Sequence, residues 1–184
     1  MNKQIRTTRT HALLSIATCS LLAMSAAHAA DSTSSATGGN VPSADRTFIE
    51  KAAISDMTEI SASKLAQEKG SSPAIKQYGA QMITDHTKSS EELMKIAAAK
   101  GVTPPGTVDK AHHSALDKLA KLSGTDFDKA YTKQMVADHK VAVALFEKEA
   151  KSGKDADLQA FAGKTLPILQ NHLGEANATY DRTK

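Results

Sequence analysis

Residues 78–86, YGAQMITDH, and residues 131–139, YTKQMVADH, nearly repeat each other 53 positions apart. Each stretch ends in an Asp-His pair, and each His follows a Met by four positions, about one helical turn. Side chains four positions apart share one face of a helix, so the pattern predicts two helices that turn a Met and a His toward one interior. We interpret the stretches as equivalent turns from a duplicated helix pair, each supplying an imidazole to a common centre.

Helical sequence extends outward from both stretches. Ala, Leu, Lys, Glu, Gln and Met dominate from Asp45 onward, no stretch sustains a two-residue alternation, and Gly and Pro fall where segments end. We therefore expect an all-α fold, an up-down four-helix bundle with a short extra helix in the crossover between the second and third long helices. The expected long helices are 45–69, 73–100, 126–151 and 156–180, with Ser72 and Thr125 as N-caps, and the short helix is 108–122.

Each expected long helix places one ionisable side chain near the middle of its apolar face. On the first helix this face reads Ala52, Ser55, Glu59 and Ala62, and each of the other three faces carries a His. Counting residues from the connecting turns, at about 1.5 Å per residue, puts these side chains at one level of the bundle. The four residues are Glu59, His86, His139 and His172.

Three imidazoles and one carboxylate suit one divalent transition metal ion, because zinc, iron, manganese and copper accept both donor types. Asp85 and Asp138 precede two of the histidines, and we expect them to orient imidazoles from outside the ligand set. The same side chains would alternatively form a buried polar network that only fixes helix register. The adjacent pair His112-His113 lacks helical spacing and is expected on the surface.

The first 29 residues have the three parts of a secretory signal peptide. A basic start is followed by the apolar run ALLSIATCSLLAM and by AHA at 27–29. We predict cleavage near Ala29, which places the mature protein in the periplasm or outside the cell. Residues 30–44 are small and polar and are expected to form a flexible leader, and residues 45–184 one folded domain.

Removal of the predicted signal peptide balances the charge of the chain. The full sequence has 23 Lys and Arg against 20 Asp and Glu, and Lys3, Arg6 and Arg9 account for the excess. A neutral mature chain is not expected to bind nucleic acid. No transmembrane segment is expected in the mature chain. Association with the cell envelope is expected. The single Cys, Cys19, lies in the signal peptide, so we expect no disulfide.

Four stretches make the chain resemble the exported bacterial family called domain of unknown function 4142. They are FIEKAAISDMTEISASKLA (48–66), IKQYGAQMITDH (75–86), FDKAYTKQMVADHKVAVALFEKEA (127–150) and LPILQNHLGEA (166–176). The resemblance covers about residues 45–182. It implies an exported, ferritin-like helical bundle whose Glu59, His86, His139 and His172 match the family pattern, and it implies no established reaction.

Three functions remain open from the sequence. The first is a non-enzymatic periplasmic protein that binds a metal ion or a small ligand at the Glu/His cluster, in envelope stress or metal handling. The second is a structural or interaction protein of the cell envelope. The third, an oxidative metalloenzyme, is disfavoured because no Glu-x-x-His motif occurs on the long helices and too few carboxylates face inward.

Overall fold

The structure is a computed structural model that describes residues 41–184, and these residues fold into helices. Apart from an isolated bridge between Gly70 and Gly124, no β-structure occurs in this range. The predicted all-α class is confirmed. The predicted signal peptide and residues 30–40 of the predicted leader lie outside the described residues. The helices are α1 (Ser43–Lys69), α2 (Pro73–Ala99), α3 (Lys110–Ala120), α4 (Gly124–Ser152) and α5 (Ala156–Asp181).

The helix ends follow local capping chemistry. Ser72 caps α2 as predicted: its hydroxyl accepts a hydrogen bond from the Ile75 backbone N–H at 3.2 Å, and Pro73 takes the first helical position. Thr125 is not an N-cap, and that prediction was wrong. The helix α4 already begins at Gly124, whose φ of +61° is a conformation that favours glycine, so Thr125 lies inside the first turn.

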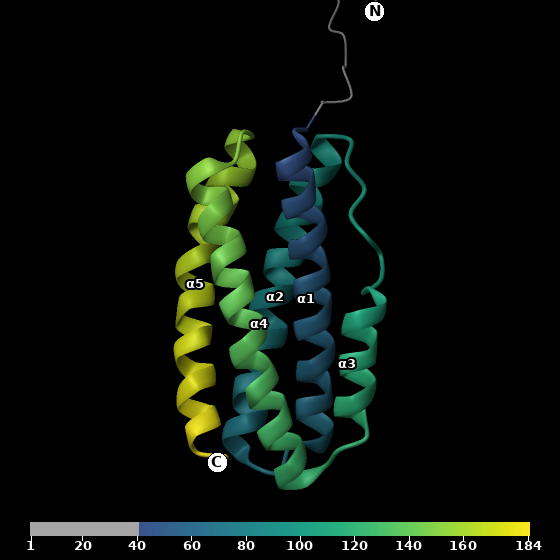
Figure 1. Ribbon diagram of the computed structural model, residues 1–184, viewed down its shortest axis with the longest axis vertical. Coiled ribbons are helices and arrows are strands. Elements are labelled where there is room, and N and C mark those ends of the chain that lie inside the picture. The colour runs from purple at the N-terminus through teal and green to yellow at the C-terminus, as the bar shows by residue number, and fades with distance from the viewer. Residues whose placement is uncertain (1–40) are drawn as a thin grey trace, which may run out of the picture. The chain divides into compact units, whose positions relative to one another are not determined.

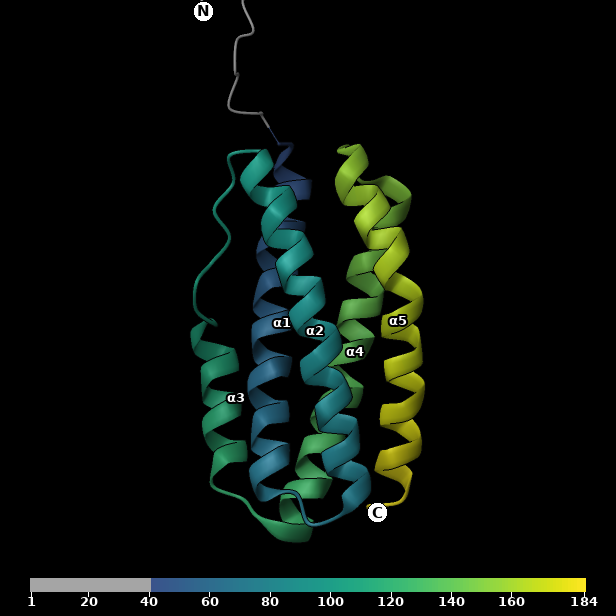
Figure 2. The same ribbon diagram turned by 180° about the vertical axis from the view of Figure 1, so that it is seen from behind.

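The four long helices lie side by side, and α3 lies outside them against α1 (Figures 1 and 2). The most extensive packing joins α1 to α2 and α4 to α5, so the fold consists of two helical hairpins. The hairpins meet along two seams, one between α1 and α4 and one between α2 and α5. Figure 1 shows that α1 descends, α2 and α4 ascend and α5 descends, so neighbouring long helices are antiparallel.

The repeated stretches fall on α2 and α4. These are the second helix of one hairpin and the first helix of the other, whereas a duplicated hairpin would place the repeat on corresponding helices. This topology does not support the hypothesis of a duplicated helix pair. The prediction that both stretches face inward is confirmed, because Met82, His86, Met135 and His139 are all buried.

A polar layer divides the apolar core into two clusters. One cluster is centred on three aromatic rings, Phe48, Phe146 and Phe161, whose centroids lie 5.0–6.3 Å apart in edge-on and tilted contacts. The other surrounds Phe127 and Tyr131, whose rings stack at 5.7 Å. Along every long helix, the predicted ionisable residue falls between the positions that belong to the two clusters.

Each hairpin turn is held by a buried carboxylate of the opposite hairpin. Asp128 on α4 accepts hydrogen bonds from the backbone N–H and the hydroxyl of Ser71, in the α1–α2 turn, at 2.9 and 2.5 Å. Asp45 on α1 accepts the backbone N–H groups of Lys154 and Asp155, in the α4–α5 turn, at 2.7–3.2 Å. These bonds fix how far the hairpins slide along each other, and thereby the level of the polar layer.

Replacing Asp128 by Ala is expected to lower the free energy of unfolding by about 2 kcal/mol, because two hydrogen bonds to a charged acceptor are lost. Chemical denaturation followed by circular dichroism measures the change. Asp126→Ala is the matched control, since Asp126 is an exposed carboxylate of the same helical turn, and its cost should stay below about 1 kcal/mol. Equal losses for the two variants would contradict a clamping role for Asp128.

Candidate metal centre

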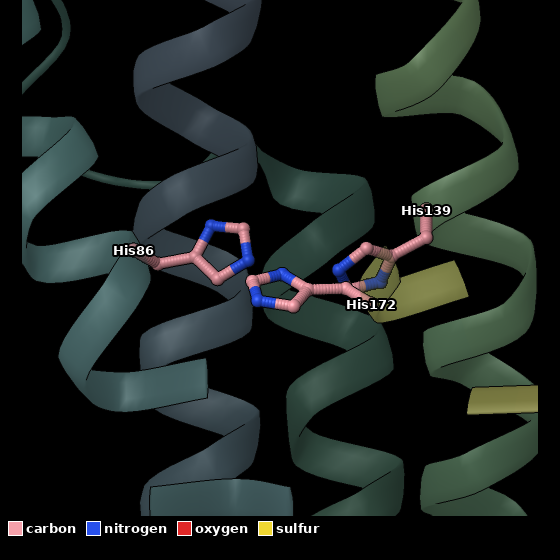
Figure 3. Close-up of side chains that lie close together, drawn as sticks. All are labelled: His86, His139 and His172. Atoms are coloured by element: carbon pink, nitrogen blue, oxygen red, sulfur yellow. The ribbon is translucent and has the colours of Figure 1, made fainter. Parts of the chain in front are cut away.

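Three histidines from three helices converge in the polar layer. His86 on α2, His139 on α4 and His172 on α5 are at most 2% exposed, and their ring centroids lie 5.4–5.6 Å apart. One ring nitrogen from each lies within 4.8 Å of the other two, a spacing that would let them hold one metal ion. Figure 3 shows the three rings turned toward one another from different sides of the bundle.

Glu59 on α1 is the fourth predicted residue, and it reaches the same layer. Its carboxylate is fully buried, and Oε2 lies 2.5 Å from Nε2 of His86 and 3.3 Å from Nε2 of His139. The contact with His86 is a short charged pair, whereas Oε1 of Glu59 has no hydrogen-bond partner. The structure therefore brings together all four residues that the sequence singled out, one from each long helix.

Every imidazole uses one ring nitrogen to bond an oxygen outside the cluster. The other nitrogen, Nε2 of His86 and His139 and Nδ1 of His172, has no hydrogen-bond partner. Metal-ligating histidines are commonly oriented in this way, with the second nitrogen held by a carboxylate or a carbonyl. The outer bonds join His86 Nδ1 to Asp56 Oδ1 at 2.8 Å, His139 Nδ1 to the Met135 carbonyl at 3.0 Å, and His172 Nε2 to Asp85 Oδ2 at 3.1 Å.

These outer bonds determine which inner nitrogens carry a lone pair. A carbonyl oxygen can only accept, so Nδ1 of His139 must donate to Met135, and the neutral ring keeps its lone pair at Nε2. That lone pair faces the carboxylate of Glu59, another acceptor. The bond to Asp85 likewise leaves the lone pair of His172 at Nδ1. Acceptors that face one another repel unless a proton or a metal cation lies between them.

Of the two aspartates that precede histidines, one contacts an imidazole and the other does not. Asp85 bonds His172, a histidine of another helix, as expected of an orienting carboxylate. Asp138 bonds none of the three imidazoles, so the structure does not give it the expected orienting role. It lines a cavity together with Glu59 and His112. Burial and the charge of Glu59 raise the pKa of Asp138 to about 6.

Sequence reasoning missed Asp56, which orients His86. The expected apolar face placed Ser55 inward, but Ser55 is half-buried and Asp56 is only 3% exposed. The sequence did indicate that Asp56 faces inward, because Asp56 precedes Glu59 by three positions, and residues three apart share a helix face. An inward face made of residues 52, 56, 59 and 63 has the same helical spacing as the predicted face of residues 52, 55, 59 and 62.

The charge state of the metal-free cluster follows from burial and these contacts. Burial acts to lower the pKa of His86, but the carboxylates of Glu59 and Asp56 outweigh it and raise that pKa to about 10. Burial lowers the pKa of His139 and of His172. Burial acts to raise the pKa of Glu59, but His86 and His139 outweigh it and lower that pKa. One imidazolium, His86, therefore balances Glu59 while the other two rings stay neutral.

The adjacent pair His112-His113 lies on α3, outside the cluster. His112 contacts Asp109 at 2.9 Å and is partly exposed, and His113 contacts Asp117 at 3.1 Å and is largely exposed. The surface location predicted for this pair is confirmed.

Within residues 41–184, no helix is apolar over enough of its length to cross a membrane.

Comparisons with known proteins identify a family and several similar folds. The family described as "Domain of unknown function (DUF4142)" matches residues 24–179. A DUF305 fragment from Deinococcus radiodurans has a TM-score of 0.69 at 9% identity, with 77% of this chain and 98% of that chain covered. CopM in its Cu(II)-bound form has a TM-score of 0.65 at 18% identity, with 76% and 97% covered. No curated protein matches the chain. At these identities the structures show a shared fold.

In the metal-free protein, the tautomers should be directly visible. Nitrogen-15 NMR of the imidazoles at pH 8 should show both ring nitrogens of His86 protonated, His139 protonated at Nδ1 alone and His172 at Nε2 alone. A neutral His86, or a protonated Nε2 on His139, would contradict the charge assignment. A sample treated with a chelator is required, since a bound ion would change all three spectra.

The same charges predict a stability maximum for the metal-free protein. The pKa values of His139 and His172 are lowered from the ordinary value of 6.5. Both rings therefore stabilise the fold fully above pH 6.5, and this stability is lost as the pH falls below it. The raised pKa of His86 contributes stability that is complete below 6.5 and is lost as the pH rises toward 10. Melting temperature measured from pH 5 to 10 should therefore decline on both sides, whereas a steady rise with pH would exclude a charged His86.

Proposed function

Because this chain belongs to the DUF4142 family, whose description assigns no function, we propose a function from the site alone: the protein binds one divalent transition metal ion. His86, His139 and His172 supply one imidazole nitrogen each, and Glu59 supplies a carboxylate oxygen. The observation that carries the proposal is the set of buried inner atoms that have no hydrogen-bond partner. Buried polar atoms are almost always partnered, so a group of them at one point calls for an explanation.

A single cation matches this set better than hydrogen bonds do. The inner atoms of Glu59, His139 and His172 are acceptors, and buried water typically makes about three hydrogen bonds, of which it donates two. A metal ion accepts lone pairs from every side, and it would replace the proton that His86 carries in the metal-free cluster. The outer bonds from Asp56, Met135 and Asp85 hold the rings in place for such an ion.

Copper is the metal that we place first. Imidazole nitrogen suits copper, zinc, iron and nickel, and at an ordinary nitrogen and oxygen site Cu(II) binds most tightly of the divalent first-row ions. The similar fold of CopM, which was solved in Cu(II)-bound and Cu(I)-bound forms, supports the choice as an analogy. Zinc is the next candidate, since four ligands of these types also suit tetrahedral Zn²⁺.

A purely structural polar network is the competing interpretation. Three pairs support it, because His86 with Glu59, His86 with Asp56 and His172 with Asp85 would persist without any metal. It leaves the lone pair of His139 facing Glu59 without an intervening donor. In that interpretation the protein is a structural or interaction component of the cell envelope.

An oxidative metalloenzyme is third. Glu59 is the one carboxylate among the four candidate ligands, and Asp56 and Asp85 are engaged with imidazoles, whereas carboxylate-bridged di-iron bundles supply about four carboxylates. We propose instead a non-enzymatic role in metal handling or envelope stress, in the periplasm or outside the cell, after cleavage near Ala29.

We further propose that the fold is a ferritin-like, up-down four-helix bundle. The antiparallel packing of the four long helices supports this classification.

Metal binding is tested by titrating metal-free, untagged protein with Cu(II) and measuring stoichiometry by calorimetry and elemental analysis. We expect one ion per chain and a melting temperature that rises with metal, since a ligand at 100 times its Kd adds about 2.7 kcal/mol of stability. The double variant His86→Gln/His139→Gln should lose the ion. The double variant His112→Gln/His113→Gln is the matched control and should keep it, because both histidines lie outside the cluster.

The competing network makes opposite forecasts for the same titration. It expects no stoichiometric metal and an unchanged melting temperature on metal addition. Circular dichroism of each variant guards against unfolding as the cause of lost binding. Binding that survives in the His86→Gln/His139→Gln variant would also refute the proposed ligand set.

Asp56→Asn is expected to weaken Cu(II) binding by about 10- to 100-fold, because it removes the carboxylate that orients His86 and raises its basicity. Competition with a chelator of known affinity measures the change. Asp117→Asn is the control, as this carboxylate pairs with the exposed His113 and should leave the affinity unchanged. An unaltered affinity in Asp56→Asn would mean that this outer bond does not serve the site.

A further inference from the structure

A metal ion must pass through protein to reach the four candidate ligands, since each is at most 2% exposed. Two cavities border the polar layer, one on each seam between the hairpins. A cavity of about 530 Å³ lies on the α1/α4 side, beside the start of α3, and we name it the α1/α4 cavity. A smaller cavity of about 300 Å³ lies between α2 and α5, and we name it the α2/α5 cavity.

The α1/α4 cavity is lined by carboxylate oxygens that have no partner. Glu59, which is 0% exposed, lines it, and both of its oxygens lack a hydrogen-bond partner. Oδ2 of Asp138, which lines the cavity from α4, is also buried and unpartnered. Lys51 and Lys148 line the cavity too, but both are exposed, where water and salt screen their charge. This cavity therefore offers two carboxylate oxygens without a close partner, Oδ2 of Asp138 and Oε1 of Glu59, whose other oxygen contacts His86.

The α2/α5 cavity differs because its acidic groups are already engaged. Asp85 bonds His172, and Glu92 pairs with Lys164 at 2.7 Å. Lys88 lies 4.0 Å from Asp85 at the same cavity. His86 and His172 also line this cavity, but the carboxylates that an arriving cation would meet here are already paired.

The asymmetry of the two cavities has a cause in the repeated Asp-His pairs. Asp85 on α2 faces His172 across one seam and bonds it. Asp138 on α4 lines the other cavity with Glu59, whose charge contributes to the raised pKa of Asp138, and two carboxylates cannot bond each other when both are ionised. The carboxylate that sequence reasoning assigned to orienting an imidazole is thus left free on the path to the cluster.

We propose that the α1/α4 cavity is the entrance through which a divalent metal cation reaches the His/Glu cluster, and that Asp138 binds the cation on its way to Glu59. This inference rests on the proposed metal site and adds its route and a transfer residue. Asp138 is not one of the four final ligands. Its carboxylate attracts the hydrated ion into the cavity, and the free oxygen of Glu59 lies next along the path.

The rate of metal uptake tests the role of Asp138. Stopped-flow absorbance of metal-free protein mixed with Cu(II) should show Asp138→Asn loading roughly 10-fold more slowly than wild type, as favourable charge raises association rates by 10- to 1,000-fold. The equilibrium affinity should stay within a few-fold of wild type. Glu92→Gln removes a carboxylate from the α2/α5 cavity and should leave the uptake rate unchanged.

A pair of blocking variants tests the route independently of charge. Val141 lines the α1/α4 cavity and is 71% exposed, and Ile168 lines the α2/α5 cavity and is 42% exposed, so a Trp at either position should be tolerated by the fold. Val141→Trp should slow Cu(II) uptake at least several-fold, and Ile168→Trp should not.

The outcomes separate this inference from the metal site itself. Slower uptake in Asp138→Asn and Val141→Trp, with unchanged affinity, supports it. Slower uptake in Glu92→Gln and Ile168→Trp instead would overturn it and place the entrance on the other seam. Wild-type rates in all four variants would also overturn it while leaving the metal site intact. A large loss of equilibrium affinity in Asp138→Asn would overturn it by making Asp138 a ligand.

Discussion

The contact of Glu59 with two imidazoles in the middle of the bundle is the constraint on which the rest of the structure depends. A buried charge that is left unpaired costs several kcal/mol, so one carboxylate in an apolar core dictates what must surround it. His86 meets that demand as an imidazolium at 2.5 Å in the metal-free protein, while His139 and His172 remain neutral. The polar layer that results splits the core into two apolar clusters, each packed around aromatic rings.

The four side chains of this layer can meet only if the four helices place them at the same level of the bundle. Hydrogen bonds to the two hairpin turns fix that level. Asp45 and Asp128 each bond the turn of the opposite hairpin, at opposite ends of the bundle. The carbonyl of Met135 and the carboxylates of Asp56 and Asp85 then set the rotation of each ring. Helix length and register set the level of the three imidazoles, and the outer bonds set their orientation. One nitrogen from each ring then lies within 4.8 Å of the other two.

Much of this arrangement could be predicted from the sequence because helix periodicity carries it. Four ionisable residues at the centres of apolar faces, and glycines and prolines at the ends, were enough to foresee the helices and the meeting of Glu59 with three histidines. Asp56 was missed because a helix face can be read in two ways that differ by one residue, and Ser55 fitted one of them. The free carboxylate of Asp138 was beyond reach, because it depends on which helix lies across the seam. Thr125 failed as a cap for a local reason, the positive φ of Gly124.

Diffraction from crystals soaked in Cu(II), recorded at the copper absorption edge, is the most direct measurement of whether the buried cluster is a metal site. We expect one anomalous peak inside the bundle, about 2 Å from an inner nitrogen of each of His86, His139 and His172, the distance found for imidazole bound to zinc. A cluster without a peak, with copper only at surface histidines such as His112, would contradict the account and leave the four side chains as a structural polar network.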